Sequence, residues 1–286
     1  MLLATALLFS TGGAAIKAAS VSSWQVAGYR SGIAAIVLWV GLPAARRALN
    51  WQAVLIGCAH AATFILFVSA NRLTTSTNAI LLQSTYPFFV LLLGPLVLRE
   101  KLTRLDLGVM GGVLAGTALI LSGTEQAAGS GTNPLAGNIA AAFSGVTWAI
   151  TLTGFRWLSR RQTAGDSAGA TMIAGNLIAF LVCLPLALQG KPMAPLDMAI
   201  ISYLGLFQVG LAYLLLTRSL PYVPVVEATT LLLAEPVFNP VWTWLLHHEQ
   251  PSGMALLGGS VILLAALGGT WARMRTKLPA ARVPAA

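Results

Sequence analysis

Long apolar stretches, joined by short polar or breaker-rich segments, occupy almost the whole chain. Each runs for 17 residues or more, close to the ~20 apolar residues with which a helix crosses a ~30 Å hydrocarbon core. The ~10-residue alternating segments of an outer-membrane barrel do not occur. The pattern therefore predicts an all-α membrane protein with ten transmembrane helices. These are expected at residues 2–18, 25–43, 52–70, 76–98, 105–122, 135–157, 168–188, 196–216, 225–246 and 253–272.

The joints between these stretches divide the chain into two halves. Proline and glycine mark several of them, as in Gly190-Lys191-Pro192, and a longer Gly/Ser-rich stretch follows the fifth helix. Residues 2–18 resemble the core of a signal peptide but lack its basic flank, so we expect a retained first helix. The predicted organisation is a five-helix repeat at 1–124, a linker at 125–134, a second repeat at 135–273 and a cytoplasmic tail at 274–286.

Composition supports this reading. Of 286 residues, 57% are hydrophobic and only 9% are charged, against about 25% charged in a soluble domain. Ten crossings use nearly the whole chain, which leaves no room for a soluble domain. Cys58 and Cys183 fall inside apolar stretches, where a cysteine acts as a small hydrophobic residue.

The distribution of Lys and Arg predicts the orientation. If the N-terminus is cytoplasmic, thirteen basic residues fall in inner loops or the tail and only Arg72 and Lys191 in outer loops, as the positive-inside rule requires. Both termini are therefore expected inside. The net charge of +9 then reflects topology and contact with anionic lipid headgroups, and a nucleic-acid partner is not expected. The inner residues are Arg46, Arg47, Arg99, Lys101, Arg104, Arg156, Arg160, Arg161, Arg218, Arg273, Arg275, Lys277 and Arg282.

An internal repeat relates the two halves. A shift of 149 residues aligns Pro87 with Pro236 and Glu100 with Glu249, without a gap. The basic residues that flank Glu100 are missing around Glu249. Five helices per half is an odd number, so the second half must insert upside down. Inverted repeats are typical of secondary transporters, in which the substrate site lies near the midplane between the repeats.

These features resemble the EamA-type transporters of the drug/metabolite transporter superfamily over essentially the full length. The resemblance rests on the mid-helix prolines, the two loop glutamates, the Gly-rich helices that follow them and Arg30 in the second helix. Where relatives often carry a Trp-Gly pair in helix one, this chain has Phe9-Ser10-Thr11-Gly12. Within the family it looks most like bacterial YddG-type exporters. That resemblance implies inner-membrane export of neutral or aromatic amino acids by alternating access, without a cofactor.

Two ionisable residues inside predicted helices are candidates for the substrate site. Glu235 directly precedes Pro236, and a carboxylate at this depth either binds a proton or a substrate amine, or satisfies carbonyl groups freed by the proline. His60 in the third helix either contacts substrate or hydrogen-bonds a neighbouring helix. Arg30 either holds a carboxylate or extends its charge outward to the membrane surface.

Polar and aromatic residues of the fourth helix are the next candidates. Gln83 and Tyr86 share one face of a continuous helix, and Asn78 lies near its start. Pro87 and Pro236 are the predicted hinges of alternating access. The remaining candidates for the cavity, for which interhelical hydrogen bonds or packing are the alternative, are Ser10, Trp148, Gln208 and Tyr213.

Other chemistries are not supported by the sequence. It contains neither H-E-x-x-H nor G-x-S-x-G, so an intramembrane protease or serine hydrolase is not expected. His247-His248 lacks spaced partners for a metal ion. Gly108, Gly112 and Gly116 form G-x-x-x-G steps, which we interpret as close helix packing inside one protomer, so a monomer is expected.

Overall fold

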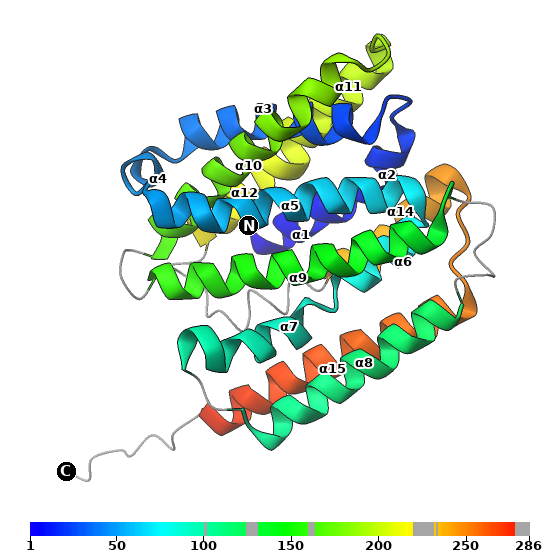
Figure 1. The fold of residues 1–286 in the computed structure, drawn as a ribbon. Coiled ribbons are helices and arrows are strands. Elements are labelled where there is room, and N and C mark those ends of the chain that lie inside the picture. Colours follow the sequence, from blue (N-terminus) through cyan, green and yellow to red (C-terminus); the bar gives the residue numbers. More distant parts are fainter. Residues whose placement is uncertain (100–101, 124–130, 160–163, 220–231, 233, 278–286) are drawn as a thin grey trace.

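The computed structural model is a bundle of long helices (Figure 1). It describes residues 1–99, 102–123, 131–159, 164–219, 232 and 234–277. Every regular element among these residues is helical, which confirms the all-α prediction for this part of the chain. Helix occurs in each of the ten predicted stretches, although the ninth is described only over its second half.

The helix bounds are close to those predicted. The elements are α1 (Leu2–Ser10), α2 (Gly12–Ala18), α3 (Ser23–Gly41), α4 (Pro43–Arg47), α5 (Trp51–Leu73), α6 (Ser76–Gln83), α7 (Tyr86–Leu93), η1 (Gly94–Leu98), α8 (Arg104–Ser122), α9 (Pro134–Ser159), α10 (Ala164–Leu188), α11 (Pro195–Tyr203), η3 (Leu204–Leu211), α12 (Ala212–Ser219), α14 (Ala234–His247) and α15 (Gly253–Lys277). Among the described residues, seven helical stretches are long and apolar enough to cross a membrane, and Leu2–Ala18 is a shorter apolar helix.

Side-chain caps fix where several helices begin. Ser22 Oγ accepts the Gln25 backbone N–H at 3.3 Å, and Gln25 Oε1 accepts the Ser22 N–H at 3.1 Å. Thr103 and Asp106 repeat this reciprocal arrangement at the start of α8. Such caps satisfy N–H groups that have no partner inside the helix. The chain therefore enters these apolar helices at defined residues.

The fourth predicted helix is interrupted, which corrects the expectation of a continuous helix over 76–98. α6 ends at Gln83 and α7 begins at Tyr86, because Pro87 has no N–H to donate back to the Gln83 carbonyl. The Ser84 and Thr85 hydroxyls instead donate to the Ile80 and Leu82 carbonyls, both at 2.7 Å. Gln83 and Tyr86 therefore do not share a face of one helix. Whether the chain bends at Pro87 during transport stays a prediction.

Matching backbone features lie 149 residues apart. Arg99 and His248, each directly before its loop glutamate, have positive φ angles of 55° and 52°. Thr103 and Ser252, which are also 149 apart, each accept a backbone N–H at the start of the following helix. A left-handed conformation is uncommon for residues with a side chain. Its recurrence at this spacing supports the repeat seen in the sequence.

Among the described residues, those that flank the helices lie at two opposite ends of the bundle. Residues just after the first, third, fifth, seventh and ninth stretches meet at one end, which we call the outer end after the predicted topology. At the opposite, inner end Arg218 donates to the Gly41 carbonyl at 3.3 Å. The outer-end contacts are Lys17 with Glu249, Ser20 with Asp197, Gln25 with the Lys191 carbonyl, and Asn133 N–H with the Leu73 carbonyl.

Helices α8 and α15 pack side by side through small residues (Figure 1). A Cβ added to Gly116 would lie 2.5 Å from the Gly258 carbonyl oxygen, and one added to Gly112 would lie 2.6 Å from the Ala265 Cβ. These contacts confirm that Gly112 and Gly116 pack within the protomer. A Cβ on Gly108 meets nothing within 4 Å among the described residues.

We expect Gly116→Ala to destabilise the protein by about 1–3 kcal/mol, because the added methyl group overlaps backbone atoms that cannot rotate away. Gly108→Ala is the matched control, and there alanine should be neutral or slightly stabilising, since it favours helix. Thermal unfolding of both variants in detergent checks this. Equal unfolding temperatures for the two variants would contradict the packing of α8 on α15.

Candidate functional site

A buried arginine lies at the centre of the candidate site. Arg30 on α3 is only 1% exposed, so it does not extend to the membrane surface. Its Nη1 donates to Gln208 Oε1 at 3.4 Å, and its Cζ lies 5.0 Å from the Phe64 ring centroid. Within the described part of the chain, its Nε and Nη2 have no hydrogen-bond partner. A buried guanidinium with free N–H groups is unusual, and it is suited to binding an anionic group.

Aromatic rings enclose His60 beside this arginine. The ring centroid of fully buried His60 lies 4.6 Å from that of Phe64, 5.5 Å from Tyr213 and 5.8 Å from Trp148. Neither ring nitrogen has a hydrogen-bond partner among the described residues. This conformation therefore shows no hydrogen bond from His60 to a neighbouring helix within the described part of the chain. His60, Trp148 and Tyr213, which the sequence could only name separately, form one cluster.

Gln208 reaches this cluster from a wide helical turn. It lies in the π-helix η3, and π-helical turns occur often at functional sites. Besides accepting from Arg30, its Nε2 lies 3.5 Å from the Phe9 carbonyl oxygen. A Cβ on Gly12 would lie 2.7 Å from Nε2, so a small residue is needed there. Gln208 thus links the first helical stretch to Arg30.

Glu235 approaches the cluster from the second half of the chain. It is half-buried on α14, and it interacts electrostatically with the phenols of Tyr86 and Tyr213. Tyr86 is the first residue after the break between α6 and α7. The predicted hinge at Pro236 stays a prediction, because residues 220–231 and 233 lie outside the described part. Tyr213 thus interacts with both Arg30 and Glu235.

Three other predicted site residues do not join this cluster by any contact in the described part. Asn78 lies near the outer end, where its Nδ2 donates to Asn138 Oδ1 at 3.5 Å. Ser10 accepts the Trp242 Nε1–H at 2.9 Å. Both make interhelical hydrogen bonds, which for Ser10 was the alternative interpretation. Gln83 is half-buried at the last residue of α6.

Two phenylalanines of the cluster were not predicted. Phe64 packs against both His60 and Arg30, and Phe9 contacts Tyr213 with a centroid distance of 5.0 Å. The signal for Phe64 was available, because residues four apart lie on the same helical face and Phe64 follows His60 by four. Phe9 carried no comparable signal.

A buried ion pair joins helices at the outer end. Lys17 Nζ lies 3.2 Å from Glu249 Oε1, and the same oxygen accepts the Ser76 backbone N–H at 2.8 Å. The two side chains are 12% and 3% exposed. Burial raises the pKa of Glu249, against the opposing effect of the Lys17 charge. The pair connects α2, the start of α6 and the end of α14, and thereby holds the outer end together.

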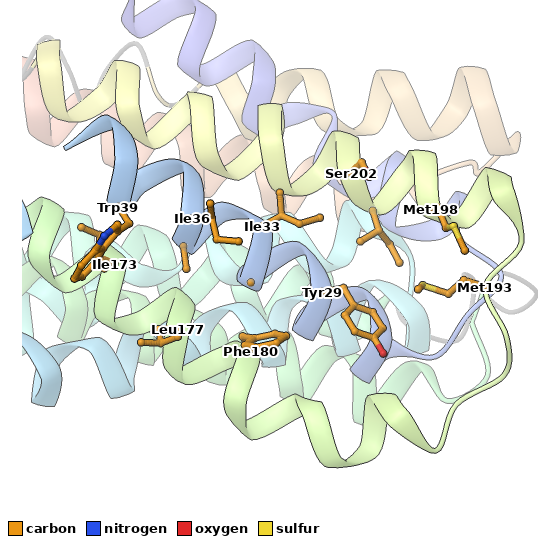
Figure 2. Close-up of a pocket in the computed structure, with 13 residues that line it drawn as sticks. Tyr29, Ile33, Ile36, Trp39, Ile173, Leu177, Phe180, Met193, Met198 and Ser202 are labelled. Carbon is orange, nitrogen blue, oxygen red and sulfur yellow. The ribbon is translucent and has the colours of Figure 1, made fainter. Parts of the chain in front are cut away.

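A separate apolar cavity lies elsewhere, on the side of the bundle. It has a volume of about 680 Å³ and lies between α3, α10 and α11 (Figure 2). None of the predicted site residues lines it, although a mostly apolar cavity was expected between the two halves. The central cluster is instead packed, since Arg30, His60, Gln208 and Tyr213 are all at most 6% exposed.

Long apolar helices around a buried polar and aromatic cluster are typical of a multi-pass membrane protein. Two segments of the chain, residues 1–122 and 135–270, match the model of the EamA-like transporter family. The chain therefore belongs to the EamA-like transporter family, and the family domain is present twice. This membership agrees with the prediction of a transporter and not an enzyme.

Individual relatives are distant. An uncharacterized transporter of Methanothermobacter thermautotrophicus (strain Delta H) is 23% identical over 201 residues. The aligned part is 70% of this chain and 58% of that protein, so the chain matches less than two thirds of the relative's length. A protein of known crystal structure superposes on this chain with a TM-score of 0.64 at 18% identity, and the superposition covers 97% of each chain. This likeness establishes the fold alone.

Proposed function

We propose that the protein is a secondary transporter that exports small zwitterionic solutes, above all neutral and aromatic amino acids, across a bacterial inner membrane. The observation that carries this proposal is the buried Arg30 guanidinium, with two N–H-bearing nitrogens unpaired among the described residues. An arginine binds a carboxylate through two parallel hydrogen bonds, and such charge-assisted bonds are strong in a dry site.

The surroundings of Arg30 fit the rest of an amino acid. Glu235, which interacts with Tyr213 as Arg30 does, offers a carboxyl group for the α-ammonium group. The rings of His60, Phe64, Trp148 and Tyr213 between them offer an apolar, polarisable surface for the side chain. An amino acid with a charged side chain would leave that charge without a partner here, so neutral and aromatic ones are favoured.

Alternating access is the proposed mechanism. Ten crossings in two inverted five-helix halves, with both termini inside, are supported by the duplicated family domain, the backbone features 149 residues apart and the Lys/Arg distribution. Two similar halves of opposite direction can exchange conformations and so turn the site from one face to the other. Export as the direction of flux follows from the resemblance to exporters.

The outer ion pair is the proposed barrier to release. Lys17 belongs to the first helical stretch and Glu249 follows the ninth, so they come from opposite halves. Arg72 adds hydrogen bonds to the Ala19 and Val21 carbonyls at 2.5 and 3.0 Å. A path from the central cluster to the outside requires Lys17 and Glu249 to separate.

Uptake of labelled amino acids into proteoliposomes of the purified protein tests this function. We expect neutral and aromatic amino acids to enter faster than into empty liposomes, and glutamate and lysine to enter no faster. A parallel series with a pH gradient shows whether protons are coupled, with Glu235→Gln as the matched variant. If folded protein moved no amino acid, the substrate class would be wrong, and another metabolite or drug would have to be sought.

A lower pH on the outer side of the membrane should favour the closed outer end. The pKa of Glu249 is raised above its ordinary 4.5 in this closed state, whereas a hydrated carboxyl in an open state regains that ordinary value. The closed state therefore binds the proton more tightly, and closure is favoured as the pH falls through the raised pKa. A cysteine at the buried position Asn239, beside Gly13 and Ser76, reports opening through maleimide labelling from outside.

The labelling rate with Glu249 is divided by the rate with Glu249→Gln at the same pH, and this ratio cancels the pH dependence of the reporter thiol itself. We expect this ratio to fall between pH 7 and about pH 5. A rising ratio would mean that protonation opens the outer end.

A further inference from the structure

The apolar cavity on the side of the bundle is a groove that faces outward. Small residues of α3, Gly32 and Ala35, are part of its lining, and Phe180 and Leu177 of α10 border it (Figure 2). Ile36 is 67% exposed, so the groove opens onto the outside of the bundle. A Cβ on Gly32 would lie 2.8 Å from Phe180 Cδ2, which shows how closely that ring lies against α3. In a membrane this face meets lipid.

The groove is long and apolar. Along α3 its lining runs from Tyr29 to Trp39, about 15 Å at 1.5 Å per residue, and Met193 and Met198 continue it towards the outer end. An acyl chain therefore fits along it within the ~30 Å hydrocarbon core of a bilayer. Its volume of about 680 Å³ is within the 300–1,000 Å³ typical of sites for small ligands. An extended acyl chain has the right shape and polarity.

One end of the groove carries a positive charge. Trp39 lies at this end, two residues before the end of α3, and Arg46 Cζ lies 5.7 Å from its ring centroid. Arg46 is half-buried, and its buried Nε has no hydrogen-bond partner in the described part of the chain. Trp and Arg are enriched where a helix meets the headgroup region, and basic residues there attract anionic lipid.

We propose that this groove is a binding site for one anionic phospholipid, with an acyl chain along α3 and α10 and the headgroup phosphate on Arg46. The Arg46 charge next to Trp39 favours this occupant over a second copy of the chain, which would need no phosphate. Placement of the headgroup at the inner surface rests on the proposed orientation. The lipid site itself does not depend on which solute is transported.

Native mass spectrometry of the full chain, released from detergent after incubation with phosphatidylglycerol or with phosphatidylcholine of the same acyl chains, tests the site. We expect one retained phosphatidylglycerol and weaker retention of phosphatidylcholine. Arg46→Gln should weaken phosphatidylglycerol binding by about fivefold, which corresponds to one basic residue near the surface. Arg47→Gln, at the exposed neighbour, is the matched control and should bind like the unaltered protein.

A second pair of variants tests the groove itself. Ala35→Leu fills the lining of the groove and should lower retention of both lipids, whereas Val40→Leu, on the exposed surface outside the groove, should not. Equal phosphatidylglycerol retention by the unaltered protein, Arg46→Gln and Ala35→Leu would overturn the proposal. So would a dimer mass that Ala35→Leu abolishes, because the groove would then be a protein interface. Both readouts are masses measured without any transport, so a failure of the lipid proposal can be told apart from a failure of the proposed amino-acid transport.

Discussion

The apparent affinity for neutral amino acids in uptake is expected to fall about 10- to 100-fold when Arg30 is replaced by glutamine. The variant loses the charge that pairs with the solute carboxylate, and a hydrogen bond to a charged group contributes about 1.5–3 kcal/mol. Initial rates over a range of solute concentrations in proteoliposomes measure this effect. Arg30→Lys keeps the charge without the paired N–H geometry, so its apparent affinity should lie between that of the unaltered protein and that of Arg30→Gln.

Stability separates a binding role of Arg30 from a structural one. Arg30 is buried, with Gln208 as its only hydrogen-bond partner in the described part, and a buried charge without a counterion costs free energy. Arg30→Gln should therefore unfold at the same or a higher temperature while uptake falls. If the variant unfolded much earlier and kept its uptake per folded molecule, Arg30 would be a structural residue. Arg47→Gln controls for removal of a positive charge.

Reversal of one charge in the outer ion pair is expected to open the outer end. Glu249→Lys places a second ammonium group next to Lys17 in a buried position, where like charges repel by several kcal/mol. Because 1.4 kcal/mol is a tenfold change, labelling of Asn239→Cys from outside should rise at least about tenfold. The reporter is placed in a background with Cys58→Ser and Cys183→Ala.

The double exchange Lys17→Glu with Glu249→Lys restores opposite charges and should return labelling most of the way to its starting rate. Glu249→Gln is the milder control, because its amide oxygen still accepts from Lys17 and from the Ser76 N–H. Persistent labelling in the double variant would show that the pair does not hold the outer end. Unchanged labelling in Glu249→Lys would contradict the closed position of these helices.

Sequence patterns predicted the helices because each depends on a long local signal. Helix occurs in every predicted apolar stretch as far as the structure describes it, and the 149-residue shift that aligns Glu100 with Glu249 also relates Arg99 to His248, which both have a positive φ. Small residues in G-x-x-x-G spacing predicted the packing of Gly116. These features can be derived from residues that are close together in the chain.

The site was predicted less completely, because it depends on which face of each helix points into the bundle. Arg30 and Gln208 are 178 residues apart, and Lys17 and Glu249 are 232 apart, so no local pattern shows that they meet. The π-helical turn that carries Gln208 has no distinct sequence signature. Asn78 is a polar residue inside an apolar helix, and it donates to Asn138 of a neighbouring helix, a pairing that no local pattern shows either.

Competition for uptake of labelled phenylalanine tests most directly the claim that Arg30 and Glu235 bind the two charges of an amino acid. The competitors are unlabelled phenylalanine, its amide, which lacks the carboxylate, and 3-phenylpropionate, which lacks the amine. We predict that phenylalanine competes at least about tenfold better than either analogue, and that Arg30→Gln removes its advantage over the amide. Equal competition by all three would show that neither charge is recognised, and would contradict this account of the site.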